Sequence, residues 1–218
     1  MAEHSLQKNR GRFITLEGGE GVGKSTLAAG LKAEFEARGK YVVLTREPGG
    51  TSGAEALRNL LLSPLEGVAW SPLAEALLFY AARSDHLDRL IRPHLARGGW
   101  VICDRFSDST RAYQAAAGGA MTEAIETLDR MCVAESMPDM TLILDLPLSD
   151  ALQRAEARGR RPDAIEGRGK NYHQRVREAF LAIAAAHPDR CVVLDASRPQ
   201  AELVAAAMAA IDQRLGKN

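Results

Sequence analysis

The segment from Gly18 to Ser25 has the residue types and spacing of a phosphate-binding loop, GxxxxGK[ST]. Glycines let the backbone curl so that successive N–H groups point at phosphate oxygens, and a following helix adds the positive end of its dipole. In this pattern Lys24 reaches the β- and γ-phosphates, and the Ser25 hydroxyl can bind magnesium. Because the segment lies between a hydrophobic run and an amphipathic one, we expect an ATP or GTP site made by Gly18, Gly19, Glu20, Gly21, Val22, Gly23, Lys24, Ser25 and Thr26.

Several arginines suit a second phosphorylated substrate. The pair Asp104-Arg105 ends a hydrophobic run, which puts a carboxylate for the metal and a guanidinium for a phosphate at one crevice. Arg46, Arg58 and Arg83 also fall near the expected crevice, although each alone is typical of a solvated surface. GTPase switches read guanine with N-K-x-D and sense the γ-phosphate with D-x-x-G, and neither tetrapeptide occurs. The sequence therefore favours phosphoryl transfer between two nucleotides.

Alternation of strand-like and helix-like segments predicts the fold that positions these residues. Near-continuous hydrophobic runs, typical of strands buried on both faces, are 13–17, 41–45, 100–104, 141–145 and 191–195. Segments of helical periodicity include 26–38, 73–95, 122–135, 172–186 and 201–215. We expect an α/β fold of the P-loop type, a doubly wound five-stranded parallel sheet surrounded by helices.

In such sheets the carboxyl ends of the strands face the ligand crevice. Glu17, Arg46 and Asp104 lie at or just past three of these ends. Asp145 and Asp195 end two more strands, but the residues after them read more simply as turns or helix caps.

The length and composition indicate one domain without a strong overall electrostatic field. The chain has 218 residues, and its 28 basic and 28 acidic side chains cancel, which argues against binding to nucleic acid or an anionic membrane. We expect a flexible tail over 1–11, one domain over 12–218, and a mobile lid at about 154–170, where charges and glycines gather. The polar start lacks a signal-peptide core, which favours the cytoplasm, and the three cysteines are expected to be buried thiols.

Four motifs in order, LEGGEGVGKST, TREPGGT, LLFYAAR and DRFSDSTRAYQ, give the chain a specific likeness. It resembles the bacterial thymidylate kinase family over nearly its whole length beyond the first ten or so residues. The resemblance implies that ATP and dTMP are converted into ADP and dTDP, that magnesium takes part, and that the chain forms a homodimer.

The resemblance also implies roles for individual residues. Lys24, Arg105 and Arg158 would be catalytic, Glu20 would bind the 3'-hydroxyl of the acceptor sugar, and Ser25 and Asp104 would hold the metal. Phe79 and Arg83 are four residues apart, hence on one helix face, so they can stack on thymine and donate to its O4; without the family, packing in the core would be the simpler reading of Phe79. The acceptor site would be lined by Glu20, Arg58, Phe79, Arg83, Arg105, Ser109, Thr110, Tyr113 and Gln114.

The chain departs from some family members at the P-loop acid. Those members place an arginine after it, whereas Glu20 is followed by Gly21 here, and arginines occur instead at positions 158, 160 and 161. This resembles the bacterial type whose lid supplies the charge. The usual lid continuation Asp-Arg-Ile-Glu reads Asp-Ala-Ile-Glu at 163–166, one residue late, so Arg158 aligns best while Arg160 and Arg161 stay open.

The mechanism implied needs no general base, because a phosphate monoester has its second pKa near about 6 and is a nucleophile at neutral pH. The histidines His86, His94, His173 and His187 are therefore interpreted as surface or helix-end residues. Two rivals remain at this point: another nucleotide or deoxynucleoside kinase, and a regulator that binds nucleotide without catalysis.

Overall fold

The computed structural model describes residues 11–63, 69–157, 159 and 163–216. A five-stranded parallel sheet forms its centre, with the order β2-β3-β1-β4-β5. The strands are β1 (Phe13–Glu17), β2 (Val42–Arg46), β3 (Trp100–Asp104), β4 (Met140–Asp145) and β5 (Cys191–Asp195). The predicted fold class is confirmed, and each predicted strand lies within one residue of the observed one.

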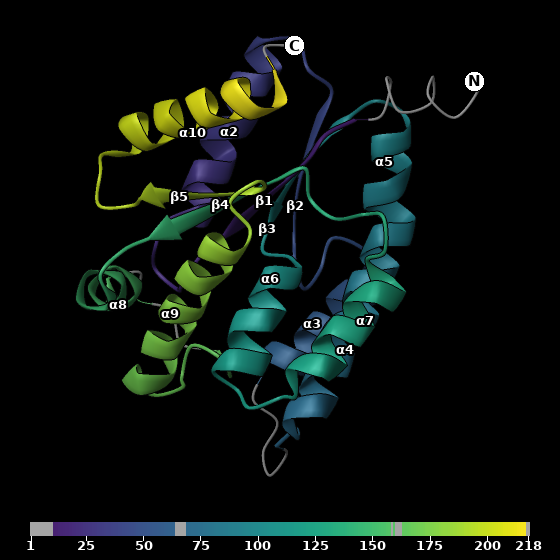
Figure 1. Ribbon diagram of the computed structural model, residues 1–218, viewed down its shortest axis with the longest axis vertical. Helices are drawn as coiled ribbons and strands as arrows, with labels where there is room; N and C mark the ends of the chain where they lie inside the picture. The colour runs from purple at the N-terminus through teal and green to yellow at the C-terminus, as the bar shows by residue number, and fades with distance from the viewer. Residues whose placement is uncertain (1–10, 64–68, 158, 160–162, 217–218) are drawn as a thin grey trace.

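Helices cover both faces of the sheet (Figure 1). Successive side chains of a strand point to opposite faces, so alternate residues pack against different helices. On one face, Ile14 and Leu16 pack with α2 (Lys24–Ala37) and α10 (Gln200–Leu215). On the other, Phe13 and Val101 pack with α4 (Pro72–His86), η2 (Leu87–Ile91), α5 (Arg92–Ala96) and α7 (Thr122–Cys132). A third cluster joins η3 (Arg111–Ala116) to α9 (Lys170–Ala186).

The helices differ from expectation in three places. The segment expected as one helix over 73–95 is interrupted by the π-helical turn η2. The helices α3 (Ser52–Leu62) and α6 (Ser107–Thr110) were not among those predicted. The helix α8 (Leu148–Glu156) extends into the first residues of the segment expected as a lid, 154–170, and α9 begins at Lys170, the last residue of that segment.

Parallel pairing places the polar strand ends side by side. In the register of the sheet Asp104 is paired with Leu16 of β1 and with Arg46 of β2, so Glu17 and the loop after β1 share one edge with them. Gly11 is already fixed by a hydrogen bond from its N–H to the carbonyl of Leu95. Within the described part of the chain no helix combines the length and apolar character that crossing a membrane requires.

Candidate active site

The loop between β1 and α2 has the backbone that a phosphate-binding loop needs. Gly18, Gly21 and Gly23 have φ values of 132°, 78° and 98°, a region that other residues rarely adopt. A Cβ at Gly21 would lie 2.1 Å from the carbonyl oxygen of Ala151 in α8, and one at Gly18 would lie 2.5 Å from a carbonyl oxygen of β4. The loop therefore keeps its shape and its close contacts only with glycine at these positions. Because α2 starts directly after the loop, its amino end faces the same space.

Lys24 is buried and folds back over this loop. Its Nζ donates to the carbonyl oxygens of Gly18 at 3.1 Å and Gly19 at 2.7 Å. Burial and the nearby cation of Arg105 lower the pKa of Lys24 to about 8, although neighbouring acids, Glu20 first among them, act in the opposite direction. The ammonium thus stays largely charged at neutral pH, and phosphate oxygens can replace the two carbonyls as its acceptors.

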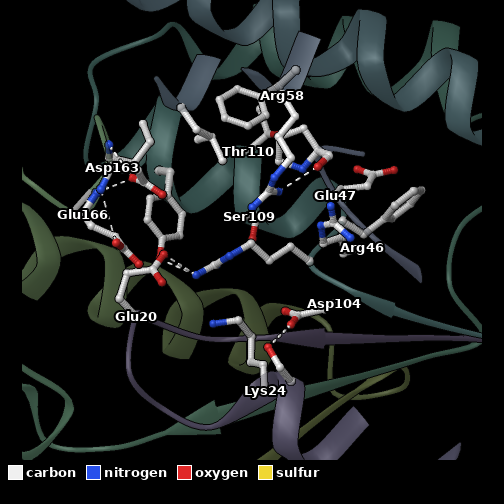
Figure 2. Close-up of a pocket in the computed structure, with 18 of the residues that line it drawn as sticks. Glu20, Lys24, Arg46, Glu47, Arg58, Asp104, Ser109, Thr110, Asp163 and Glu166 are labelled. Carbon is white, nitrogen blue, oxygen red and sulfur yellow. Dashed lines mark hydrogen bonds and ion pairs between the residues drawn. The ribbon is translucent and has the colours of Figure 1, made fainter. Parts of the chain in front are cut away.

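Ser25 and Asp104 bring two side-chain oxygens together at the pocket, and Figure 2 shows Asp104 near Lys24. Ser25 Oγ donates to Asp104 Oδ2 at 2.8 Å, which joins the start of α2 to the end of β3. Mg²⁺ usually binds one or two protein oxygens and takes its remaining ligands from phosphates and water. The pair therefore fits a magnesium ion that arrives with a nucleotide.

Arg105 follows β3 in a left-handed backbone conformation with φ of 71°, which is uncommon for a residue with a side chain. Consecutive residues of a strand point to opposite faces, and this change of backbone lets Arg105 line the same pocket as Asp104. Its guanidinium donates to Glu20 Oε1 at 2.6 Å, to Tyr113 Oη at 3.0 Å and to Ser109 Oγ at 3.1 Å. It therefore connects the phosphate loop with the segment that follows β3.

Glu17 stabilises the turn around Arg105 through hydrogen bonds. Its Oε1 accepts the N–H groups of Phe106 at 2.8 Å and Ser109 at 3.2 Å, and its Oε2 accepts the Ser109 hydroxyl at 2.6 Å. Complete burial and the charge of Asp108 raise the pKa of Glu17 to about 7, although the Ser109 hydroxyl and Arg105 act against them. The sequence marked Glu17 only as a polar strand end, so its role in holding the Arg105 turn was missed.

Glu20 is ionised despite its enclosed position. Burial favours the neutral acid, but the cations of Arg105 and Lys24 hold the pKa of Glu20 at about 2. The Tyr113 hydroxyl donates to its Oε1 at 3.3 Å, and a side-chain hydrogen bond with Glu166 connects it to the lid. An acid held in this way presents acceptor oxygens to a ligand hydroxyl.

From the phosphate loop the pocket continues to a second group of residues. Phe79, half-buried on α4, lines it, as do Thr110 and Gln114. Of the two interpretations of Phe79, its place on the pocket wall favours the one that faces a ligand. Arg58 on α3 lines the pocket as well, and its Nη1 donates to the carbonyl of Pro48 at 2.8 Å.

Arg83 is the buried cation at this end of the pocket, with 2% of its surface exposed. Its Nε donates to Glu47 Oε2 at 2.8 Å and its Nη2 to Thr110 Oγ1 at 3.0 Å. The other oxygen of Glu47 lies 3.1 Å from His86 Nδ1, and His86 Nε2 lies 2.7 Å from Thr45 Oγ1. Among the described residues the Nη1 of Arg83 has no hydrogen-bond partner. A buried unpaired donor costs about 1–3 kcal/mol, which an acceptor on a ligand would offset.

The structure brings almost all the predicted site residues to this one pocket. They are Glu20, Gly21, Gly23, Lys24, Ser25, Arg58, Phe79, Arg83, Asp104, Arg105, Ser109, Thr110, Tyr113 and Gln114. Gly18, Gly19 and Val22 border a smaller cavity behind the loop instead, and Thr26 is exposed on α2. Arg158, Arg160 and Arg161 lie outside the described residues.

Three residues of the segment expected as a lid line the pocket wall but were not predicted as site residues: Asp163, Ile165 and Glu166. The Asp163 carboxylate accepts the N–H groups of Ile165 and Glu166, both at 2.9 Å, which fixes a turn at one side of the pocket (Figure 2). The Asp-Ala-Ile-Glu stretch was the signal that could have identified them.

Comparison with known proteins identifies the family. The family model for thymidylate kinase matches residues 16–207. The chain belongs to the thymidylate kinase family. The thymidylate kinase of Caulobacter vibrioides is 51% identical over 95% of this chain and 99% of that protein. The thymidylate kinase of Rhizorhabdus wittichii is 52% identical over 89% of this chain and 94% of that protein. The crystal structure of thymidylate kinase from Ehrlichia chaffeensis has a TM-score of 0.73 at 32% identity, and the alignment covers 93% of this chain and 99% of that one.

Membership confirms the family that the four motifs indicated. The activity of thymidylate kinases is transfer of the γ-phosphoryl group of ATP to dTMP, so the interpretation as a kinase is confirmed over the GTPase switch and the non-catalytic regulator.

Proposed function

We propose that, in the reaction of ATP with dTMP that gives ADP and dTDP, ATP binds on the phosphate loop and dTMP in the pocket between Arg105 and Arg83. The observation that carries this assignment is Arg83, which lines the pocket that also contains Lys24 and whose buried Nη1 lacks a partner within the described chain. Figure 2 shows Lys24 at one end of this pocket and Thr110, the partner of Arg83, toward the other. The unpaired donor of Arg83 can form a hydrogen bond with the O4 of thymine.

The same arrangement gives each remaining group a role. Arg105 would bind the phosphate of dTMP, Glu20 would accept the 3'-hydroxyl, and the ring of Phe79 would stack on the base. Glu20 and Arg105 are already joined at 2.6 Å, so the sugar and phosphate subsites are arranged before the substrate binds. Such preorganisation lowers the entropy lost when the two substrates are aligned.

In the chemical step an oxygen of the dTMP phosphate forms a bond to the γ-phosphorus, the bond from that phosphorus to the bridging oxygen breaks, and ADP leaves. The acceptor phosphate is largely dianionic at neutral pH, since its second pKa is about 6, so no residue has to remove a proton. Lys24 and Arg105 stabilise the charge on the transferring group and on the acceptor. Ser25 and Asp104 would hold Mg²⁺, which when bound neutralises phosphate charge.

The catalytic lid arginine stays a prediction from the sequence. Gly21 leaves the phosphate loop without an arginine, so Arg158 is proposed to supply the missing charge. Arg158→Ala should lower kcat strongly with little change in the affinity for dTMP, and Arg160→Ala and Arg161→Ala are its matched controls. A loss in a control with normal kcat in Arg158→Ala would move the role to that control residue.

A homodimer and a cytoplasmic location are also proposed. Leu73 and Leu77 are 44% and 47% exposed and, with the exposed Ala81, form an apolar stripe along α4. A second copy of the chain would cover this stripe and remove its apolar surface from water. Sedimentation of the wild type should give twice the monomer mass, and Leu77→Glu should reduce it.

The direct test of the activity measures ADP release with ATP and each of dTMP, dUMP, dCMP, dAMP, dGMP and thymidine. We expect turnover with dTMP to exceed that with all the others. Preference for another monophosphate, or for thymidine, would identify a different kinase and contradict the proposed function.

A further inference from the structure

A buried acid, Glu75, lies near the part of the pocket assigned to the base. It contacts the lining residue Gln114 but does not line the pocket. Glu75 on α4 is 8% exposed, and its Oε1 accepts from Gln114 Nε2 at 2.7 Å. Its Oε2 accepts from Arg168 Nη2, at the end of the lid. Gln114, with 2% of its surface exposed, lines the pocket, whereas Glu75 does not.

This contact fixes the orientation of the Gln114 amide. An ionised carboxylate has no proton to donate, so only the NH₂ end of the amide can face it. Both Glu75 oxygens act as acceptors, because the Arg168 guanidinium, which has only donors, contacts Oε2. Arg168 is itself anchored, because its Nη1 donates to the Tyr172 hydroxyl at 2.8 Å. The planar amide therefore turns its carbonyl oxygen away from Glu75, as the group available to a ligand.

Two fixed groups then define a pattern on the pocket wall. Arg83 offers a donor through Nη1, and Gln114 offers an acceptor through Oε1. Thymine and uracil present the complement, an acceptor at O4 beside a donor at N3–H. Cytosine presents the reverse, a donor at N4 and an acceptor at N3, so both contacts would fail.

We infer that Glu75, held by Arg168, is a positioning residue that sets the Gln114 amide and so makes the pocket select thymine or uracil over cytosine. This inference rests on the proposed function, because it assumes that the base lies between Arg83 and Gln114. Arg168, at the end of the segment expected as a lid, would thereby contribute to recognition of the base.

The test uses Glu75→Gln, which keeps the size of the side chain but can present either an oxygen or an NH₂ to Gln114. With the amide free to turn, kcat/KM for dTMP relative to dCMP should fall about 10-fold or more, because a buried hydrogen-bonding pair gives a pocket its discrimination. The ratio of dTMP to dUMP should not change, because these bases share the same edge. Arg168→Met should lower the dTMP to dCMP ratio in the same direction. Glu126→Gln is the matched control, because Glu126 on α7 loses an ion pair with Arg111 of η3.

A folded Glu75→Gln protein with the wild-type ratio would overturn the inference. An equal loss for dTMP and dCMP would overturn it too, because it would show a merely structural role. If Glu75→Gln does not fold, the ratio in Arg168→Met decides, with a fall supporting the inference and a wild-type value overturning it. A wild-type protein inactive with dTMP would refute the proposed function itself, and this inference with it.

Discussion

Replacing Arg83 by lysine tests the base pocket while keeping a cation beside Glu47. The guanidinium uses Nε for Glu47 and Nη2 for Thr110, which leaves Nη1 for a ligand. A lysine has one nitrogen and cannot serve all three partners. A hydrogen bond from a charged donor contributes about 1.5–3 kcal/mol. At about 1.4 kcal/mol per factor of ten, its loss should lower kcat/KM for dTMP roughly 10- to 150-fold.

The assay is a two-substrate kinetic analysis of Arg83→Lys together with urea unfolding. The KM for dTMP should rise while that for ATP stays near the wild-type value, since Arg83 is assigned to the acceptor base. Arg83→Ala is less informative, because leaving Glu47 buried and without its cation costs about 3–5 kcal/mol of folding free energy. An unchanged KM for dTMP in Arg83→Lys, or an equal rise in both KM values, would refute the assignment.

Three further predictions concern the phosphate loop and the acid beneath it. Lys24→Ala should lower kcat about 10²- to 10³-fold in the ADP-release assay while leaving the thermal midpoint close to that of the wild type, and a normal rate would remove Lys24 from catalysis. Gly23→Ala should destabilise by about 1–2 kcal/mol through backbone strain alone, because nothing lies within 4 Å of its Cβ position. Gly21→Ala must also displace Ala151, which should add about 1–3 kcal/mol in urea unfolding, and equal losses would contradict this. For Glu17 the pKa is about 7 in the folded state against 4.5 ordinarily. The folded state therefore holds a proton that the unfolded state has lost, so stability should fall on the order of 3 kcal/mol as pH rises from about 4.5 to 7. Glu17→Gln should show a flatter urea-unfolding profile between pH 5 and pH 8, and an identical profile would exclude this role.

Motifs with fixed local geometry could be read from the sequence. Ser25 and Asp104 are 79 residues apart, yet their contact follows once each is placed at the crevice edge of a parallel sheet. Phe79 and Arg83 were expected on one helix face because they are four apart, and both line the pocket. In such cases strand topology or helical spacing determines the result.

Contacts that depend on how distant elements pack could not be read in this way. His86 was interpreted as a surface or helix-end residue; it ends α4 but is fully buried against Glu47 and Thr45. That environment forms only when α4 packs on the loop after β2, and the hydrophobic periodicity of the sequence does not predict this packing. The left-handed conformation of Arg105 was missed for a similar reason, because it depends on the buried Glu17 rather than on any local residue preference.

The contact between Gly21 and Ala151 has a consequence for how such enzymes diverge. In some thymidylate kinases an arginine follows the loop acid, but here the carbonyl of Ala151 would lie 2.1 Å from the first carbon of any side chain at position 21. The helix α8, which leads into the lid, therefore occupies the room that a loop arginine would need. The charge proposed for Arg158 could therefore not be moved to the phosphate loop of this chain by one substitution at position 21. Position 21 and the path of α8 have to change together, which predicts that the two types of thymidylate kinase are separated by correlated replacements in both segments.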